Sequence, residues 1–132
     1  MFEVVVKAEA PYYAVDGVSL GRVSIDKTFR GDLEGSSHVE MLAAGTPVQG
    51  SAGYVAIEHV KGSLLGRVGG FVLQHSGTMV RGRPALSVSV VPDSGTGELV
   101  GLSGTMSIEI SDAKHSYIFE HSLALDPRPS TP

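Results

Sequence analysis

Short runs of alternating apolar and polar residues, separated by glycine, extend along nearly the whole chain. Within Ser87–Val90 and Ser107–Ile110 the alternation is strict, which is typical of β-strands that bury one face. No segment has the apolar spacing of a helix. The chain has 17 glycines in 132 residues, and most fall between the alternating runs, where turns and bulges need them. This pattern predicts an all-β fold.

Eight segments are predicted to be strands: Phe2–Ala8, Val18–Arg30, Ser37–Ala44, Gly53–Lys61, Gly69–Thr78, Ala85–Val91, Gly104–Ser111 and Tyr117–Leu125. Connections such as the glycine-containing Val60–Gly70 and the turn cluster Pro92–Gly97 predict antiparallel pairing of neighbouring strands. We expect a single domain over residues 1–125 and a disordered tail over 126–132, because its prolines cannot continue a ladder. Eight short strands can form either a sandwich or a barrel, and periodicity alone does not separate these.

Composition limits the classes of function. The chain has no cysteine, which excludes disulfides, thiolate metal sites and a cysteine nucleophile. Its net charge is -4 and its basic residues are scattered, so we expect no nucleic-acid partner. No apolar run approaches the roughly 20 residues that cross a bilayer, and the first residues lack the layout of a secretory signal, so we expect a cytoplasmic protein without a membrane partner. Only 18% of residues are charged, against about 25% on average, which suggests surface covered in a homo-oligomer.

Four stretches resemble the bacterial proteins grouped as domain-of-unknown-function family 3224: Lys27–Gly35, Gly53–Gly62, Phe71–Thr78 and Val91–Gly104. The most specific parts are the run Phe-Val-Leu-Gln-His-Ser-Gly and the turn Gly-Thr-Gly-Glu-Leu. That family is similar in fold to the allene oxide cyclase-like barrels, which include plant dirigent proteins. The resemblance therefore implies a closed antiparallel eight-stranded barrel rather than a sandwich. It implies no activity, because the family is uncharacterised and a fold does not determine a function.

The strand pair from Gly53 to Thr78 carries the leading candidate residues. If it turns near Leu65 and Gly66, Glu58 faces Gln74. One face then carries Tyr54, Ala56, Glu58, Val72 and Gln74, and the other carries Val55, Ile57, His59, Phe71, Leu73 and His75. The first face, with small and polar groups around a carboxylate, suits a ligand cavity, whereas the second suits a filled core.

Glu58 is the candidate catalytic residue, because a carboxylate inside a barrel would have a raised pKa and act as general acid or base. The alternative is a surface hydrogen bond between Glu58 and Gln74. Glu40 lies in a similar apolar frame and is a candidate second carboxylate, and Ser89 is a candidate hydroxyl from a later strand. The predicted binding residues are Glu40, Tyr54, Glu58, Val72, Gln74 and Ser89.

The remaining motifs predict no metal site, serine nucleophile or dinucleotide site. The five histidines include no His-x-His pair, so we expect no metal, and no cofactor is predicted either. The chain has no Gly-x-Ser-x-Gly elbow. Gly95–Gly101 differs from a dinucleotide fingerprint by one residue and leads into a strand, so we interpret it as a tight turn.

We expect a protein that binds a small apolar or partly polar metabolite in the barrel lumen. A second hypothesis is a cofactor-independent cyclase, isomerase or lyase in which Glu58 moves a proton. A third is a structural or interaction protein whose lumen is filled with side chains.

Overall fold

The computed structural model describes residues 2–8, 13–111 and 114–123, and all its regular elements are β-strands. They are β1 (Phe2–Ala8), β2 (Tyr13–Val15), β3 (Val18–Phe29), β4 (Leu33–Gly45), β5 (Ala52–Leu64), β6 (Arg67–Val80), β7 (Arg83–Val90), β8 (Thr96–Gly97), β9 (Leu102–Ser111) and β10 (Lys114–Leu123). A strand lies in each of the eight predicted segments, although several bounds differ and residues 124–125 of the last segment lie outside the described residues. The short β2 and β8 were not predicted. The predicted tail over 126–132 lies outside the described residues. Nowhere in the described ranges is there a helix long and apolar enough to cross a membrane.

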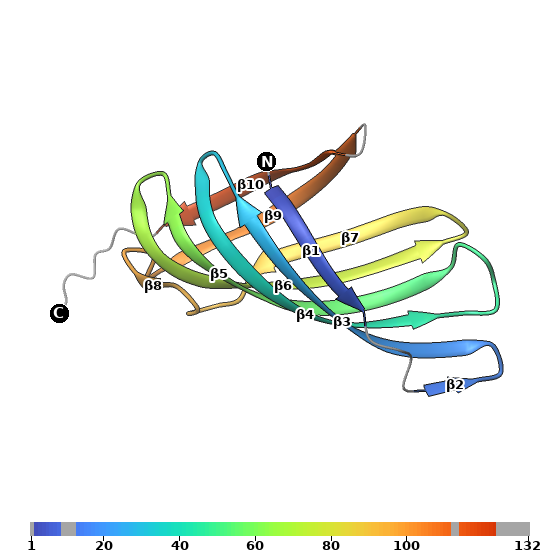
Figure 1. Cartoon of the computed structure of the whole chain (residues 1–132). Coiled ribbons are helices and arrows are strands. Elements are labelled where there is room, and N and C mark those ends of the chain that lie inside the picture. Colours follow the sequence, from blue (N-terminus) through green and yellow to red (C-terminus); the bar gives the residue numbers. More distant parts are fainter. Residues whose placement is uncertain (1, 9–12, 112–113, 124–132) are drawn as a thin grey trace.

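The strands form one antiparallel sheet in the order β1-β3-β4-β5-β6-β7-β9-β10. The sheet curls so that β1 and β10 approach each other (Figure 1). No hydrogen-bonded ladder joins these two strands within the described residues, and β7 and β9 share only the pair Ser89 and Thr105. The expected closed barrel is therefore not supported, because closure requires continuous ladders around the whole circumference. The fold is an all-β antiparallel sheet that is curled but not closed by hydrogen bonds.

The turn between β5 and β6 determines which residues share a face. Leu65 and Gly66 form a two-residue loop, with φ values of 50° and 84°, as in a type I′ turn. This loop places Glu58 opposite Leu73 and Ala56 opposite His75. The predicted pairing of Glu58 with Gln74 is wrong by one residue. Such a slip moves every side chain of β6 to the other face of the sheet.

A pair of glycines explains the bend of the central strands. Gly35 on β4 lies opposite Gly62 on β5, with φ values of 151° and 154°. A Cβ atom on Gly35 would lie 2.1 Å from the carbonyl oxygen of Lys61. Only glycine permits so close an approach of two strands, and such glycines are typical of bends in a sheet.

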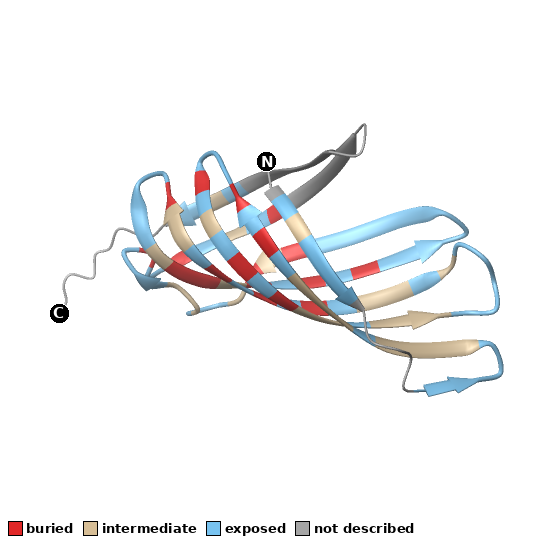
Figure 2. Ribbon diagram, viewed as in Figure 1, coloured by how far each residue is buried: buried red, intermediate tan, exposed pale blue. Residues whose placement is uncertain are grey.

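The hydrophobic core lies on one face of the sheet, because burial alternates from residue to residue along the central strands β5 and β6. We call this face the concave face. It comprises Phe29, Leu33, Val60, Leu64, Phe71, Leu73, Val88, Val90, Leu99, Leu102 and Met106. Buried residues gather at one end of the curled sheet, whereas the opposite ends of β4 to β7 are exposed or half-buried (Figure 2). We call these two regions the packed end and the flared end. The opposite face, with Leu42, Val55, Ile57 and Gln74, is the convex face.

Candidate functional site

A buried polar cluster lies on the concave face around Glu58, whose exposed fraction is 0%. Its Oε1 accepts a hydrogen bond from Lys27 Nζ at 3.2 Å and lies 2.7 Å from His75 Nε2. Its Oε2 accepts a hydrogen bond from Ser37 Oγ at 2.5 Å. Lys27, Ser37 and His75 are also buried. The four residues come from the neighbouring strands β3, β4, β5 and β6.

The partners of Glu58 determine its charge state. Burial raises the pKa of this carboxyl, but the hydrogen bond with His75, the charge of Lys27 and the hydrogen bond from Ser37 together lower the pKa below its usual value. The sequence predicted a raised pKa because it offered burial without these partners, and that prediction is wrong. Glu58 is therefore an ionised acceptor with both oxygens engaged, rather than a proton donor at neutral pH.

The six predicted binding residues divide between the two faces. Tyr54 and Glu58 are four residues apart on β5, so both side chains lie on the concave face. The corrected register places Val72 and Gln74 on the convex face, where Gln74 lies opposite Ser89 of β7. Glu40 is also on the convex face, opposite Ile57. The predicted grouping of Glu40 and Gln74 with Glu58 in one cavity is therefore wrong, because the sheet lies between them.

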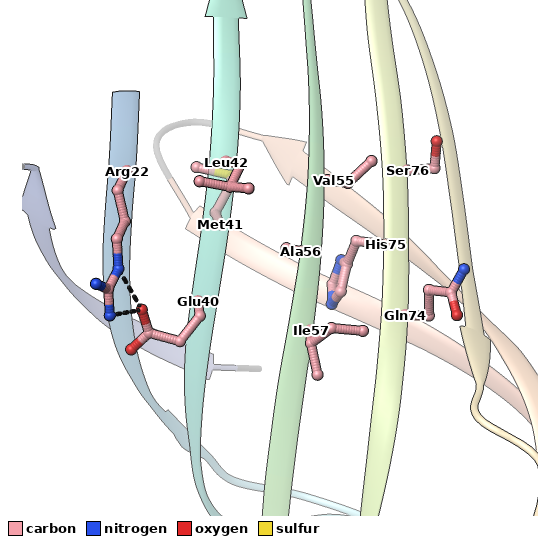
Figure 3. A pocket seen from close by; sticks show the side chains of 10 residues that line it. All are labelled: Arg22, Glu40, Met41, Leu42, Val55, Ala56, Ile57, Gln74, His75 and Ser76. Carbon is pink, nitrogen blue, oxygen red and sulfur yellow. Dashed lines mark hydrogen bonds and ion pairs between the residues drawn. The ribbon is translucent and has the colours of Figure 1, made fainter. Parts of the chain in front are cut away.

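A groove with a volume of about 660 Å³ lies on the convex face across β4, β5 and β6 (Figure 3). Leu42 faces Val55 across the strands, Ile57 lies beside them, and together they provide an apolar floor. Arg22 and Glu40 lie along one side, and Gln74 and Ser76 lie along the other (Figure 3). Met41, Ala56 and His75 also line the groove. Because side chains alternate along a strand, we infer that these three contribute their backbone.

The charges at the edge of the groove are paired with one another. Glu40 Oε1 accepts hydrogen bonds from Arg22 Nε at 2.9 Å and Nη2 at 2.7 Å. The bonds from Arg22 and, next, from His38 lower the pKa of Glu40. The ring of His38 bridges Asp26 and Glu40, and hydrogen bonds to these two carboxylates raise its pKa. A ligand in the groove would therefore meet a nearly charge-balanced edge.

Two polar side chains on the other side of the groove are available to a ligand. Neither Gln74 nor Ser76 makes a side-chain hydrogen bond to any described residue. The groove thus combines an apolar floor with an amide and a hydroxyl, as small-molecule sites do. Among the residues that the structure describes, no group of three or more histidine or carboxylate side chains, His38 with Asp26 and Glu40 included, has an arrangement that could hold a metal ion.

The sequence matches the model of a protein family of unknown function, DUF3224, over residues 1–121. The chain belongs to the DUF3224 family. A DUF3224 protein of unknown function from Shewanella oneidensis MR-1 has a similar crystal structure, with 52% sequence identity, a TM-score of 0.88 and 93% of each chain covered. No curated protein matches this DUF3224 chain. The family resemblance is thereby confirmed, whereas its link to the allene oxide cyclase-like barrels stays a prediction.

Sequence reasoning missed Lys27 and Ser37 as partners of Glu58. A signal for the ion pair was present, because Lys27 occupies an apolar position in the alternation Val23, Ile25, Lys27, Phe29. Glu58 likewise stands between Ala56 and Val60. Opposite charges at apolar positions of two predicted strands indicate a buried ion pair, since an unpaired buried charge is costly. The partner strands still had to be brought into register.

Proposed function

We propose that this DUF3224 protein binds a small apolar or partly polar molecule in the groove on the convex face. The observation that carries the proposal is the apolar floor: Leu42, Val55 and Ile57 are 50%, 55% and 49% exposed and adjoin one another in a hollow. Single exposed aliphatic residues are ordinary, but adjoining ones in a groove are typical of a binding site. The volume of about 660 Å³ falls within the range of ligand pockets.

The polar groups around the floor limit how a ligand would lie. Its apolar body would cover Leu42, Val55 and Ile57, and a polar group would bond with Gln74 or Ser76. Of the predicted binding residues, Glu40 and Gln74 retain a role at this groove. Glu58 is buried on the other face and cannot contact a ligand in this groove. Gln74, rather than Glu58, would orient the ligand.

The other two hypotheses receive less support. A cyclase, isomerase or lyase working through Glu58 needs a carboxyl that substrate can reach, and this one is ionised and fully buried. A filled interior is consistent with the packed end of the concave face, and it is compatible with binding on the opposite face. The homo-oligomer and the cytoplasmic location stay predictions.

The proposal is tested by titrating the protein with N-phenyl-1-naphthylamine, a neutral apolar dye whose fluorescence rises in an apolar site. The variant V55T/I57T keeps β-branched side chains but makes the floor polar. The two substitutions together take away three apolar carbons, one from Val55 and two from Ile57, and the loss of about 0.8 kcal/mol for each weakens dye binding about fiftyfold. The control variant V68T/V80T changes exposed valines outside the groove and keeps the wild-type affinity.

Equal affinities of V55T/I57T and wild-type protein for the dye would contradict the proposal. Native mass spectrometry of the protein purified from its own host then identifies what the groove carries. A bound molecule that is retained by V68T/V80T and lost from V55T/I57T is the expected result.

A further inference from the structure

The convex groove continues toward the flared end of the sheet into a second hollow, with a volume of about 430 Å³. Leu42, Val55 and Ser76 line both hollows, so the two form one elongated depression. The small or apolar residues that line only the second hollow include Leu20, Ala44 and Gly53. Three successive rows of outward-facing residues span the depression. Its length is therefore about 14 Å, because two residues of a strand span about 6.8 Å.

The strand register divides this depression lengthwise. Along β5 its three rows carry the apolar or small residues Ile57, Val55 and Gly53. The residues opposite them on β6 are Gln74, Ser76 and Thr78, which we call the polar column. Figure 3 shows Gln74 and Ser76 on one side of Val55 and Ile57. An apolar stripe and a polar stripe thus run side by side along the strands.

The polar stripe is wider than one strand. Ser89 of β7 lies opposite Gln74, and Ser87 lies opposite Ser76. None of these side chains carries a charge. A solvated sheet face is normally polar on every strand, so the unusual feature is the apolar stripe beside the polar one. Together the two stripes match a molecule that is apolar along one edge and polar along the other.

The polar column is available to such a molecule. Its three side chains are exposed, and Thr78, like Gln74 and Ser76, makes no side-chain hydrogen bond to a residue that the structure describes. Hydroxyl and amide groups both donate and accept, so the column can bind hydroxyl or carbonyl groups. Successive members of the column are about 7 Å apart along the strand, whereas Gln74 and Thr78 are about 14 Å apart. Every pair at the shorter spacing therefore includes Ser76.

We propose that the convex groove selects an elongated molecule that is apolar along one edge and carries two hydroxyl or carbonyl groups about 7 Å apart along the other. This selectivity rests on the proposed function, because it concerns the same groove. The apolar edge of the ligand covers Val55 and Ile57. Its two polar groups bond with Ser76 and with either Gln74 or Thr78, so Ser76 is the residue that determines specificity.

The experiment compares two isomers of dihydroxynaphthalene by isothermal titration calorimetry. The 2,7-isomer carries both hydroxyls along one long edge, at the spacing of the polar column, whereas the 2,6-isomer carries them on opposite edges. The two have the same apolar area and the same number of hydroxyls. Wild-type protein binds the 2,7-isomer about two- to tenfold more tightly, because that isomer makes one additional hydrogen bond. Both isomers bind more weakly to V55T/I57T, which lacks the apolar floor.

The variant Ser76→Ala tests the spacing. It lowers the affinity for the 2,7-isomer by about two- to tenfold, because the remaining members of the column are too far apart to bond with both hydroxyls. The affinity for the 2,6-isomer is nearly unchanged, since its one bonded hydroxyl can still use Gln74 or Thr78. The matched control is Ser36→Ala, at an exposed position of β4 outside both hollows, which keeps the discrimination of the wild-type protein.

The outcomes separate this selectivity from the proposed function. Equal affinities of the wild-type protein for the two isomers, or discrimination that persists in Ser76→Ala, would overturn the selectivity alone. Binding of the naphthylamine dye without binding of either isomer would also overturn the selectivity alone. Dye affinity that V55T/I57T leaves unchanged would overturn the proposed function and the selectivity with it.

Discussion

The substitution Glu58→Gln removes one charge from the centre of the buried cluster while keeping the size of the side chain. Lys27 Nζ then lies within the protein without the carboxylate that it contacts at 3.2 Å. Breaking a buried ion pair by removing one partner costs about 3–5 kcal/mol, because the remaining charge loses its counter-charge while it stays buried. Lys27 and Glu58 are both buried, so solvent screens little of this effect. We expect Glu58→Gln to lower the free energy of unfolding by about 3–5 kcal/mol at pH 7.

The assay is urea unfolding followed by far-ultraviolet circular dichroism. Domains are stable by about 5–15 kcal/mol, so the variant stays folded in water and its transition moves to lower urea. The double variant Glu58→Gln with Lys27→Met also removes the cation that Glu58 pairs with in the wild-type protein. Its loss of stability is therefore smaller than the sum of the two single losses by about 1–3 kcal/mol.

The matched control is Glu34→Gln, the same change at an exposed position of β4, which alters stability by at most about 0.5 kcal/mol. A loss of about 0.5 kcal/mol or less for Glu58→Gln would refute the reasoning, because the carboxylate would then not hold the cluster together. Strict additivity of the two substitutions would refute the ion pair itself.

Three further predictions concern the loss of stability in acid, the close approach of β4 and β5, and the turn at Leu65. Because the folded-state pKa of Glu58 lies below its usual 4.5, its stabilising effect is complete above that pH and is lost as the pH falls through the folded pKa. Urea unfolding between about pH 3 and 6 should therefore show a steeper acid loss in wild-type protein than in Glu58→Gln. In thermal unfolding, Gly35→Ala should lower the free energy of unfolding by about 3 kcal/mol or more, because the new Cβ would lie 2.1 Å from a backbone oxygen. The control Gly66→Ala should lower it by only about 1 kcal/mol, from φ strain, because its Cβ would have no atom within 4 Å. Equal costs would contradict the close approach of β4 and β5. Leu65→Asn should stabilise by about 0.5–1 kcal/mol in urea, because Leu65 has a φ of 50° and asparagine tolerates that region better.

The identity of the elements could be predicted from the sequence because it depends on local chemistry. Alternation in Ser87–Val90, and glycine between such runs, are properties of a few neighbouring residues, and the structure has strands there. The family could also be identified from the sequence, because its motifs are contiguous runs of residues such as Phe71–Thr78. Even the buried ion pair left a trace, in charged residues at apolar positions 27 and 58.

Which side chains lie together was decided by the tertiary structure. A shift of one residue in the pairing of two strands moves every side chain of one strand to the opposite face of the sheet. The bend near Leu65 and Gly66 was predicted, but its length was not. A loop centred on Gly66 would place Glu58 opposite Gln74, whereas the two-residue loop of the structure places it opposite Leu73. One residue of slip exchanged Gln74 for His75 beside Glu58 and transferred Gln74 to the convex groove. Closure depended on every ladder around the sheet, and the single pair between β7 and β9 has no local signature. Local sequence thus determined the strands of this protein, and long-range pairing determined its two faces.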